Sequence, residues 1–282
     1  GPADLIGRAV AAEMAKAAGQ PIVVENRAGA GGNIAGDYVA RAPKDGYTLL
    51  FGSSPVLVIN PALYKSMKFN PLTDFQPIAD FGSMPNAILV NRALGVSSVP
   101  QLLELGKKAP LNYASAGSGG TTHLAGVLFA QKTGTELTHI PYKGSGPALQ
   151  ALLANQVEVT FTDILTAKPF VESGKLQMLA LTSSQRSPLF PQVQTLAEQG
   201  IPGVDVSVFF ALLAPSGIPE EVKNKLSELS QTVLKRPALL NQLQSRGLNI
   251  PVNNTPQALA DKMKKETQEW SSVVKASGAT LD

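Results

Sequence analysis

Alternation of short apolar strands with helical segments most strongly constrains the fold. Strand-length apolar runs recur before residue 98 and again from 111 to 182, and segments with helical periodicity separate them. Such alternation is typical of α/β proteins. A long apolar strand over 204–213 and the helices after it need a sheet to pack on, and we place them on the first set. The sequence therefore predicts two α/β lobes joined by two crossings, with 1–98 plus 206–282 as one lobe and 99–205 as the other.

The individual elements follow from periodicity, capping residues and turn residues. In the first set we expect helices over 4–18 and 33–42, and strands over 21–26, 47–51, 75–81 and 87–91. In the second set we expect helices over 101–109, 121–131 and 148–154, and strands over 111–114, 137–142, 157–161 and 176–182. Helices over 219–234, 238–245 and 256–276 close the chain. The run 47–51 is nearly all apolar, as buried parallel strands are.

Residues 111–126 are the stretch best suited to hold a ligand. They read as a strand, a Ser/Gly loop over 115–120 and a helix that begins near Thr121. Such a junction leaves backbone N–H groups unpaired at the positive end of the helix dipole, so the expected ligand is a carboxylate or a phosphate. In the alternative, Thr121 or Thr122 caps its own helix and the glycines only turn the chain. The local sequence leaves both interpretations open.

Small polar side chains also follow other predicted strands. Ser53 and Ser54 come after the strand over 47–51, and Asp163 comes shortly after the strand over 157–161. Open parallel sheets bind ligands at the carboxyl ends of their strands. Asp163 either caps the next helix or meets a ligand ammonium or hydroxyl. A site that is rich in hydrogen-bond donors and poor in nucleophiles is more typical of a binding protein than of an enzyme.

Composition and missing motifs argue against several other functions. The chain has no cysteine, which excludes disulfides, thiolate metal sites and thiol catalysis. It has neither a G-x-S-x-G elbow nor a complete dinucleotide or P-loop motif, and its two histidines do not form an H-E-x-x-H zinc motif. We therefore expect no catalytic residue, no metal and no cofactor. At a net charge of +3 the basic residues are dispersed, which gives nucleic-acid binding little support.

The two histidines have different expected roles. His123 lies near a helix N-terminus, which would lower its pKa and leave it a neutral group that supports the ligand rather than a base. His139 lies in a strand and reads as a half-buried side chain whose hydrogen bonds are satisfied. Two other functions stay open: an enzyme that uses Asp163 with His123, and a sensor that signals ligand binding to a membrane kinase.

Six blocks of sequence carry a family resemblance. They are DLIGR at 4–8, GQPIVVENRAGAGG at 19–32, DGYTLL at 45–50, YASAGS at 113–118 with HLAG at 123–126, HIPYKG at 139–144, and the segment 191–200. In this order they resemble the Bug-type receptors, which are the periplasmic solute-binding proteins of tripartite tricarboxylate transporters. The resemblance covers nearly the whole chain.

The resemblance implies a periplasmic-binding-protein fold whose two lobes close over a small carboxylated solute such as a di- or tricarboxylate, an amino acid or an aromatic acid. It also implies a periplasmic monomer that delivers its ligand to membrane permease subunits and has no nucleic-acid partner. The implied ligand-binding positions are Ala3, Asp4, Ser53, Ser54, Ser115, Ala116, Gly117, Ser118, Thr121, Thr122, His123 and Asp163.

The chain departs from the family pattern in two places. Family members usually begin with a strand and a Pro-Gly-Gly loop, whereas residues 1–4 start inside that loop, so we expect the first strand of the first lobe to be missing from the sequence. Gly7 stands where relatives more often carry alanine, which should weaken the first helix slightly.

Overall fold

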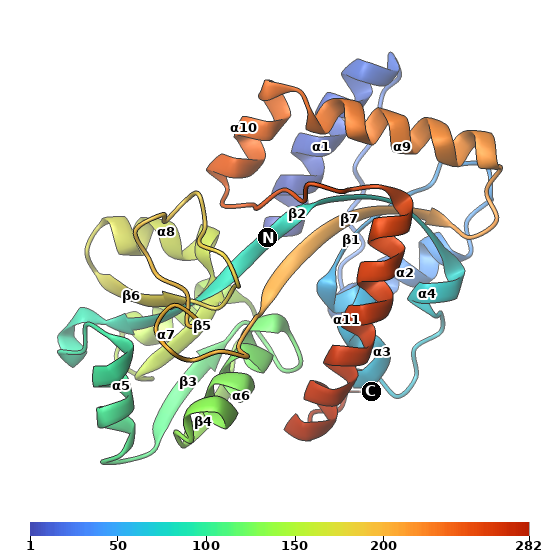
Figure 1. The fold of residues 1–282 in the computed structure, drawn as a ribbon. Helices are drawn as coiled ribbons and strands as arrows, with labels where there is room; N and C mark the ends of the chain where they lie inside the picture. The colour runs from blue at the N-terminus through green and yellow to red at the C-terminus, as the bar shows by residue number, and fades with distance from the viewer. Residues whose placement is uncertain (282) are drawn as a thin grey trace. The chain divides into compact units, whose positions relative to one another are not determined.

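The chain folds into two compact units, and the computed structural model describes residues 1–281. Unit 1 comprises Gly1–Ser83 and the C-terminal segment from Phe209, and unit 2 comprises Met84–Val208 (Figure 1). Residues 84–98, which the sequence assigned to the first lobe, therefore belong to unit 2. Strands β2 (Phe75–Asn91) and β7 (Ser207–Pro215) carry the chain from one unit to the other.

Unit 1 is built mainly from helices around a few strands, in which β7 lies between β1 and β2. Its elements are α1 (Pro2–Ala18), a 3₁₀ turn (Ala30–Gly32), α2 (Asn33–Ala40), β1 (Leu50–Ser53), a π-helical turn (Pro55–Ile59), α3 (Asn60–Leu63), α4 (Pro71–Asp74), α9 (Glu220–Leu234), α10 (Pro237–Ser245) and α11 (Pro256–Ser277). Helices α1, α9 and α10 pack together, and α11 packs on the π-helical turn and α3.

Two expectations for unit 1 are wrong. The segment 21–26 forms no strand, and Val23 in it is 88% exposed, because β-branched residues alone do not supply a partner strand. Strand β1 pairs antiparallel with β7, with Leu50 opposite Leu213, rather than lying in a parallel sheet.

Gly7 has a packing role in α1. An added Cβ there would lie 3.0 Å from the ring of Phe51, so the glycine lets the helix approach β1 closely. Glycine at this position lowers the helix propensity of α1 slightly but permits the close contact with Phe51.

Unit 2 is an α/β unit with one sheet. Its elements are a 3₁₀ turn (Arg92–Leu94), α5 (Val99–Gly106), β3 (Leu111–Ser115), α6 (Thr121–Thr133), β4 (Leu137–Pro141), α7 (Ser145–Leu153), β5 (Val159–Asp163), α8 (Ile164–Glu172) and β6 (Leu176–Leu181). The strand order here is β6-β2-β5-β3-β4. Strand β3 runs parallel to β4 and β5, whereas β2 runs antiparallel to β5 and β6. Strands β3 to β6 therefore all end at the same edge of the sheet, which we call the carboxyl edge of unit 2.

Strand β2 corrects the prediction of two strands over 75–81 and 87–91. It is one strand of 17 residues that passes through Gly82–Pro85, a segment whose composition is typical of a turn. Gly82 has φ of 110°, and its N–H donates to the Asp80 carboxylate at 2.8 Å. Ser83 exchanges two backbone hydrogen bonds with Asn249, at 2.9 and 2.8 Å. The turn-forming residues thus make an irregularity inside a strand.

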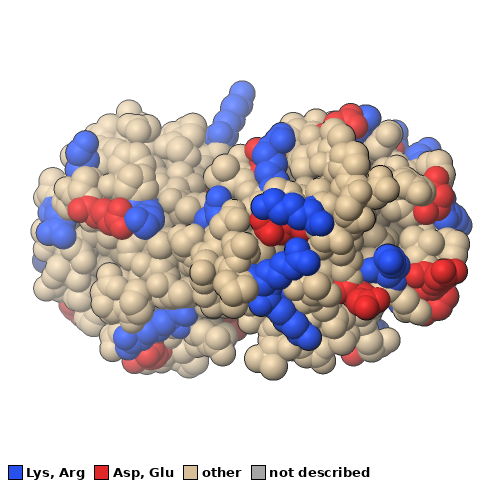
Figure 2. All heavy atoms as spheres, turned by 90° about the horizontal axis from the view of Figure 1, so that it is seen from above, with Lys and Arg blue, Asp and Glu red and all other residues tan. Residues whose placement is uncertain are grey.

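The surface carries charges of both signs. On the face drawn in Figure 2, Lys and Arg side chains lie among Asp and Glu rather than forming one continuous basic surface. Among residues 1–281, no helix combines the length and apolar character that a membrane span needs. In the same part of the chain, no group of three or more His, Asp or Glu side chains is arranged to hold a metal ion.

Candidate ligand-binding site

The carboxyl edge of unit 2 gathers three helix N-termini. Five residues separate β3 from α6, three separate β4 from α7, and α8 follows β5 directly. Helix α6 lies against β3, β4 and β5, and α7 lies against β3 and β5. Because helix N-termini present unpaired N–H groups and a partial positive charge, this edge is suited to a negatively charged ligand.

The loop between β3 and α6 is held by side chains next to it. The N–H of Ala116 donates to the Thr122 hydroxyl oxygen at 2.9 Å. The N–H of Gly119 donates to His123 Nδ1 at 2.9 Å, and that of Gly117 donates to the Ser115 hydroxyl oxygen at 3.2 Å. Several donors of the loop are therefore already used to fix its shape.

The start of α6 has no side-chain cap. Its N-cap residue is Gly120, and the threonines that follow make no capping hydrogen bond. The interpretation in which Thr121 or Thr122 caps its own helix is therefore wrong, since the Thr122 hydroxyl accepts from Ala116 instead. The first N–H groups of a helix have no acceptor within the helix, so those at the start of α6 need an acceptor from elsewhere.

Two stacked histidines support this loop. The rings of His123 and His139 lie 3.9 Å apart between centroids and 11° from parallel. His139 Nε2 lies 2.6 Å from the Ser115 hydroxyl, and the Tyr113 hydroxyl donates to the carbonyl of His123 at 3.1 Å. This stack was missed at the level of sequence because it depends on the pairing of β3 with β4, which places Tyr113 opposite His139.

Both histidines favour the neutral form. Burial lowers the pKa of His123, and burial together with the nearby His123 lowers the pKa of His139 to about 4. His123 Nδ1 accepts a hydrogen bond, so this nitrogen carries no proton. Burial, rather than the helix N-terminus, therefore favours the neutral state expected for His123. A neutral ring whose Nδ1 is occupied is a supporting group rather than a free base.

The lowered pKa of His139 makes acid unfolding depend on this ring. In the unfolded chain histidine protonates near pH 6.5, whereas in the folded protein His139 resists protonation until about pH 4. The stability that this residue contributes is therefore present above pH 6.5 and is lost as pH falls from 6.5 to 4. We expect His139→Gln to show a smaller fall in melting temperature over this interval than the parent protein. If the melting temperatures of the variant and the parent protein fell equally between pH 6.5 and pH 4, the stacked, neutral histidine pair would be contradicted.

Asp163 caps α8 at the carboxyl edge. Its Oδ1 accepts from the Thr166 N–H at 2.8 Å, and its Oδ2 accepts from the Ser145 hydroxyl at 2.7 Å. The side chain is buried, with 6% of its residue surface exposed. The capping role is thus present, and ligand contact by Asp163 remains a prediction. The described residues show no hydrogen bond between Asp163 and His123, so the structure gives no support to a catalytic pair.

Asn86 is a candidate that sequence reasoning missed. It lies on β2 opposite Asp163 on β5, and only 1% of its surface is exposed. Among residues 1–281, neither its side-chain nitrogen nor its side-chain oxygen has a hydrogen-bond partner. The only sequence signal was a polar residue at the start of an apolar strand, which is too common to single out.

The predicted residues of unit 1 lie at the start of α1 and the end of β1. Ala3 and Asp4 are in the first turn of α1, and the Asp4 carboxylate accepts from Asn26 and from Arg8, each at 2.9 Å. The Asn26 hydrogen bond and the charge of Arg8 lower the pKa of Asp4. Ser53 ends β1. The buried hydroxyl oxygen of Ser54 accepts from the N–H of Phe209 at 2.8 Å, so part of its capacity serves the fold.

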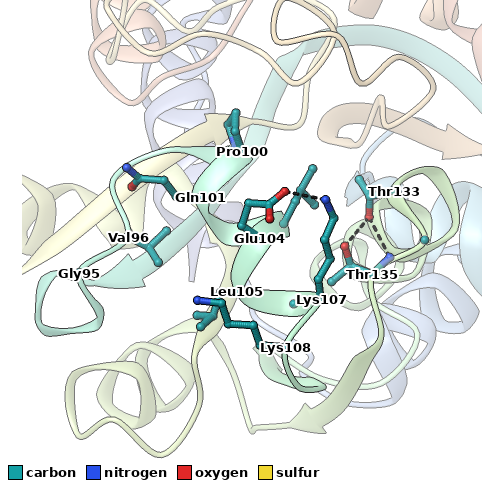
Figure 3. Close-up of a pocket in the computed structure, with 13 residues that line it drawn as sticks. Gly95, Val96, Pro100, Gln101, Glu104, Leu105, Lys107, Lys108, Thr133 and Thr135 are labelled. Atoms are coloured by element: carbon teal, nitrogen blue, oxygen red, sulfur yellow. Dashed lines mark hydrogen bonds and ion pairs between the residues drawn. The ribbon is translucent and has the colours of Figure 1, made fainter.

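A surface hollow of about 640 Å³ lies elsewhere in unit 2. Figure 3 shows its lining, which comes from the segment before α5, from both ends of α5 and from the C-terminal end of α6, with an ion pair between Glu104 and Lys107 at 2.6 Å. Helix α6 has 13 residues, so this hollow is about 20 Å from the N-terminus of α6.

The comparisons with known proteins assign the family. The family model described as the tripartite tricarboxylate transporter family receptor matches residues 6–279. The chain belongs to this receptor family. The resemblance inferred from the six sequence blocks is thereby confirmed, and the family is one of solute-binding receptors rather than enzymes.

Relatives of this receptor cover its whole length. Protein BugT of Bordetella pertussis is 35% identical over 284 residues, which span 100% of this chain and 87% of BugT. The structure of Rpa4515 of R. palustris with adipate is 34% identical with a TM-score of 0.89, covering 99% of this chain and 94% of that one. The structure of MatC from Rhodopseudomonas palustris with bound malate is 33% identical with a TM-score of 0.84, covering 97% and 95%. The predicted two-lobed α/β periplasmic-binding-protein fold is therefore confirmed.

Proposed function

We propose that this receptor captures a small carboxylated solute in the periplasm and delivers it to the membrane permease subunits of a tripartite transporter. The observation that carries the proposal is the uncapped N-terminus of α6, which follows a loop already fixed by its own hydrogen bonds. A carboxylate placed there meets unpaired N–H groups and the positive end of the helix dipole. Two relatives, Rpa4515 and MatC, were solved with adipate and malate.

In unit 2, Ser118 and the N–H groups at the start of α6 hold the carboxylate, while Thr122 and His123 keep the loop in shape. The family resemblance also implies ligand contacts by Ala3, Asp4, Ser53 and Ser54, which belong to unit 1. In this proposal the receptor acts as a monomer and binds its solute without a catalytic step.

A thermal-shift screen against dicarboxylates, tricarboxylates, amino acids and aromatic acids tests the proposal. An acid at a hundred times its Kd should stabilise the protein by about 2.7 kcal/mol, because only the folded state binds it. A folded protein that is stabilised by none of these acids would contradict the proposed function.

Thr122→Val tests the loop directly. Valine keeps the shape of threonine but removes the acceptor for the Ala116 N–H, so the loop loses a restraint. We expect about a tenfold loss of affinity for the best acid from the screen, equivalent to about 1.4 kcal/mol. Thr133→Val is the matched control, because the Thr133 hydroxyl donates to the Phe129 carbonyl at the other end of α6. Equal affinities of the two variants would rule out a role for the loop.

A further inference from the structure

The side chain of Asn86 is buried. Only 1% of its residue surface is exposed, and in the part of the chain that the structure describes both polar atoms of its amide lack a hydrogen-bond partner. Its backbone is held firmly, since its carbonyl accepts from the N–H of Thr182 at 2.9 Å and from the hydroxyl of Thr182 at 3.0 Å. A buried amide without hydrogen-bond partners destabilises a protein. The presence of this amide at the edge of the sheet therefore points to a ligand that supplies the missing hydrogen bonds.

The amide lies beside the carboxylate of Asp163. The two residues are opposite each other on antiparallel strands β2 and β5, so their side chains share one face with Cβ atoms about 4.5–5.5 Å apart. By alternation along β5, this face also carries Phe161, whose ring contacts Phe129 of α6 at 5.8 Å. Asn86 and Asp163 therefore lie on the side of the sheet that α6 covers, at the edge where α6 begins.

Among the described residues, no positively charged side chain pairs with the Asp163 carboxylate. Its hydrogen bonds come from the hydroxyl of Ser145 and from the N–H and hydroxyl of Thr166, all neutral donors. Within residues 1–281 the structure shows no ion pair to this carboxylate. Such a group repels a second carboxylate and attracts a hydrogen-bond donor.

We propose that Asn86 and Asp163 form a specificity subsite that recognises a hydroxyl or ammonium group on the bound acid. This inference rests on the proposed function and narrows the substrate class to hydroxy acids and amino acids. The ligand donor binds the Asp163 carboxylate, and the Asn86 amide both donates to the ligand and accepts from it. An acid with only methylene groups leaves the amide unpaired and the charge of Asp163 uncompensated, and sites of this kind discriminate strongly.

Calorimetric titration with matched acids tests the subsite. The series are malate and aspartate against succinate, lactate and alanine against propionate, and mandelate and phenylglycine against phenylacetate. In the series that binds, we expect the hydroxy or amino acid to bind at least about tenfold more tightly than its parent acid. A parent acid that binds equally well would overturn the inference and leave the proposed function intact. Failure of all of these acids and of the wider screen to bind would instead contradict the proposed function.

Two variants separate the subsite from a structural role. Asn86→Leu should abolish the preference within the series and raise the melting temperature of the ligand-free protein by about 2–4 °C, because it removes an unpaired buried amide. Asp163→Asn keeps an acceptor for capping α8 but removes the charge, so it should weaken the amino acid more than the hydroxy acid. Retention of the parent preference in both variants would overturn the proposal.

Thr160→Val is the matched control for the subsite. The Thr160 hydroxyl is also buried and unpaired on β5, but three residues before Asp163, so it lies on the opposite face of the sheet. We expect this variant to keep the preference for hydroxy or amino acids. A loss as large as that of Asn86→Leu would show that any change in β5 or β2 disturbs binding and would remove the support for the subsite.

Discussion

Gly126→Ala should destabilise the protein by about 3 kcal/mol, the upper end of the usual cost of overpacking. Gly126 lies in α6 against the ring of Tyr113, and an added Cβ would lie 2.3 and 2.5 Å from two ring atoms. The ring is only 2% exposed and its hydroxyl donates to the His123 carbonyl, so it has little room to move. Denaturant unfolding of the variant measures the loss of unfolding free energy.

The control for this prediction is Gly146→Ala in α7. An added Cβ there meets no atom within 4 Å, and alanine favours helices over glycine. We expect the control to be unchanged or more stable by up to about 1 kcal/mol. If Gly126→Ala were as stable as this control, the result would contradict the close packing of α6 on β3. It would also contradict the position of the loop between β3 and α6.

Glu266→Gln should stabilise the protein at pH 8 by up to about 3 kcal/mol. Burial raises the pKa of Glu266 on α11 to about 7; Lys262 opposes the shift and Asp80 adds to it. The folded protein therefore binds this proton more tightly than the unfolded chain, whose glutamate titrates near 4.5. Stability from this group is present below pH 4.5 and is lost as pH rises through 7. Glutamine stays neutral, so the variant avoids the loss.

Thermal or denaturant unfolding between pH 4.5 and 8 measures this effect. The difference between Glu266→Gln and the parent protein should be small at pH 4.5 and largest at pH 8. Glu269→Gln is a suitable control, because Glu269 lies on the same helix but is exposed, with Lys265 at 3.6 Å. A pH-independent difference for Glu266→Gln would contradict the buried carboxyl group.

The sequence predicted best those elements whose pattern is local. The strand, Ser/Gly loop and helix over 111–126 were placed correctly, because turn residues, periodicity and a helix of 13 residues agree within one short segment. The errors arose where strand pairing decides the local structure. Residues 21–26 have strand composition but no partner, and Gly82–Pro85 have turn composition but lie within β2, held by backbone bonds to Asn249.

The candidate site shows the same division. The Ser/Gly loop before α6 was evident from its own residues, whereas the role of Thr122 depended on whether its hydroxyl accepts from an N–H of its own helix or from that of Ala116, which a local pattern cannot decide. The stack of His123 on His139 and the position of Asn86 opposite Asp163 depend on strand register. Register is a tertiary property, so these neighbours became visible only in the fold.

A crystal structure of the protein saturated with its tightest-binding acid would show where the ligand carboxylate binds. We expect a carboxylate oxygen within hydrogen-bond distance of the N–H groups of Thr121 and its neighbours at the start of α6. Density for an acid bound elsewhere in the protein, with these N–H groups contacted only by solvent, would contradict this expectation.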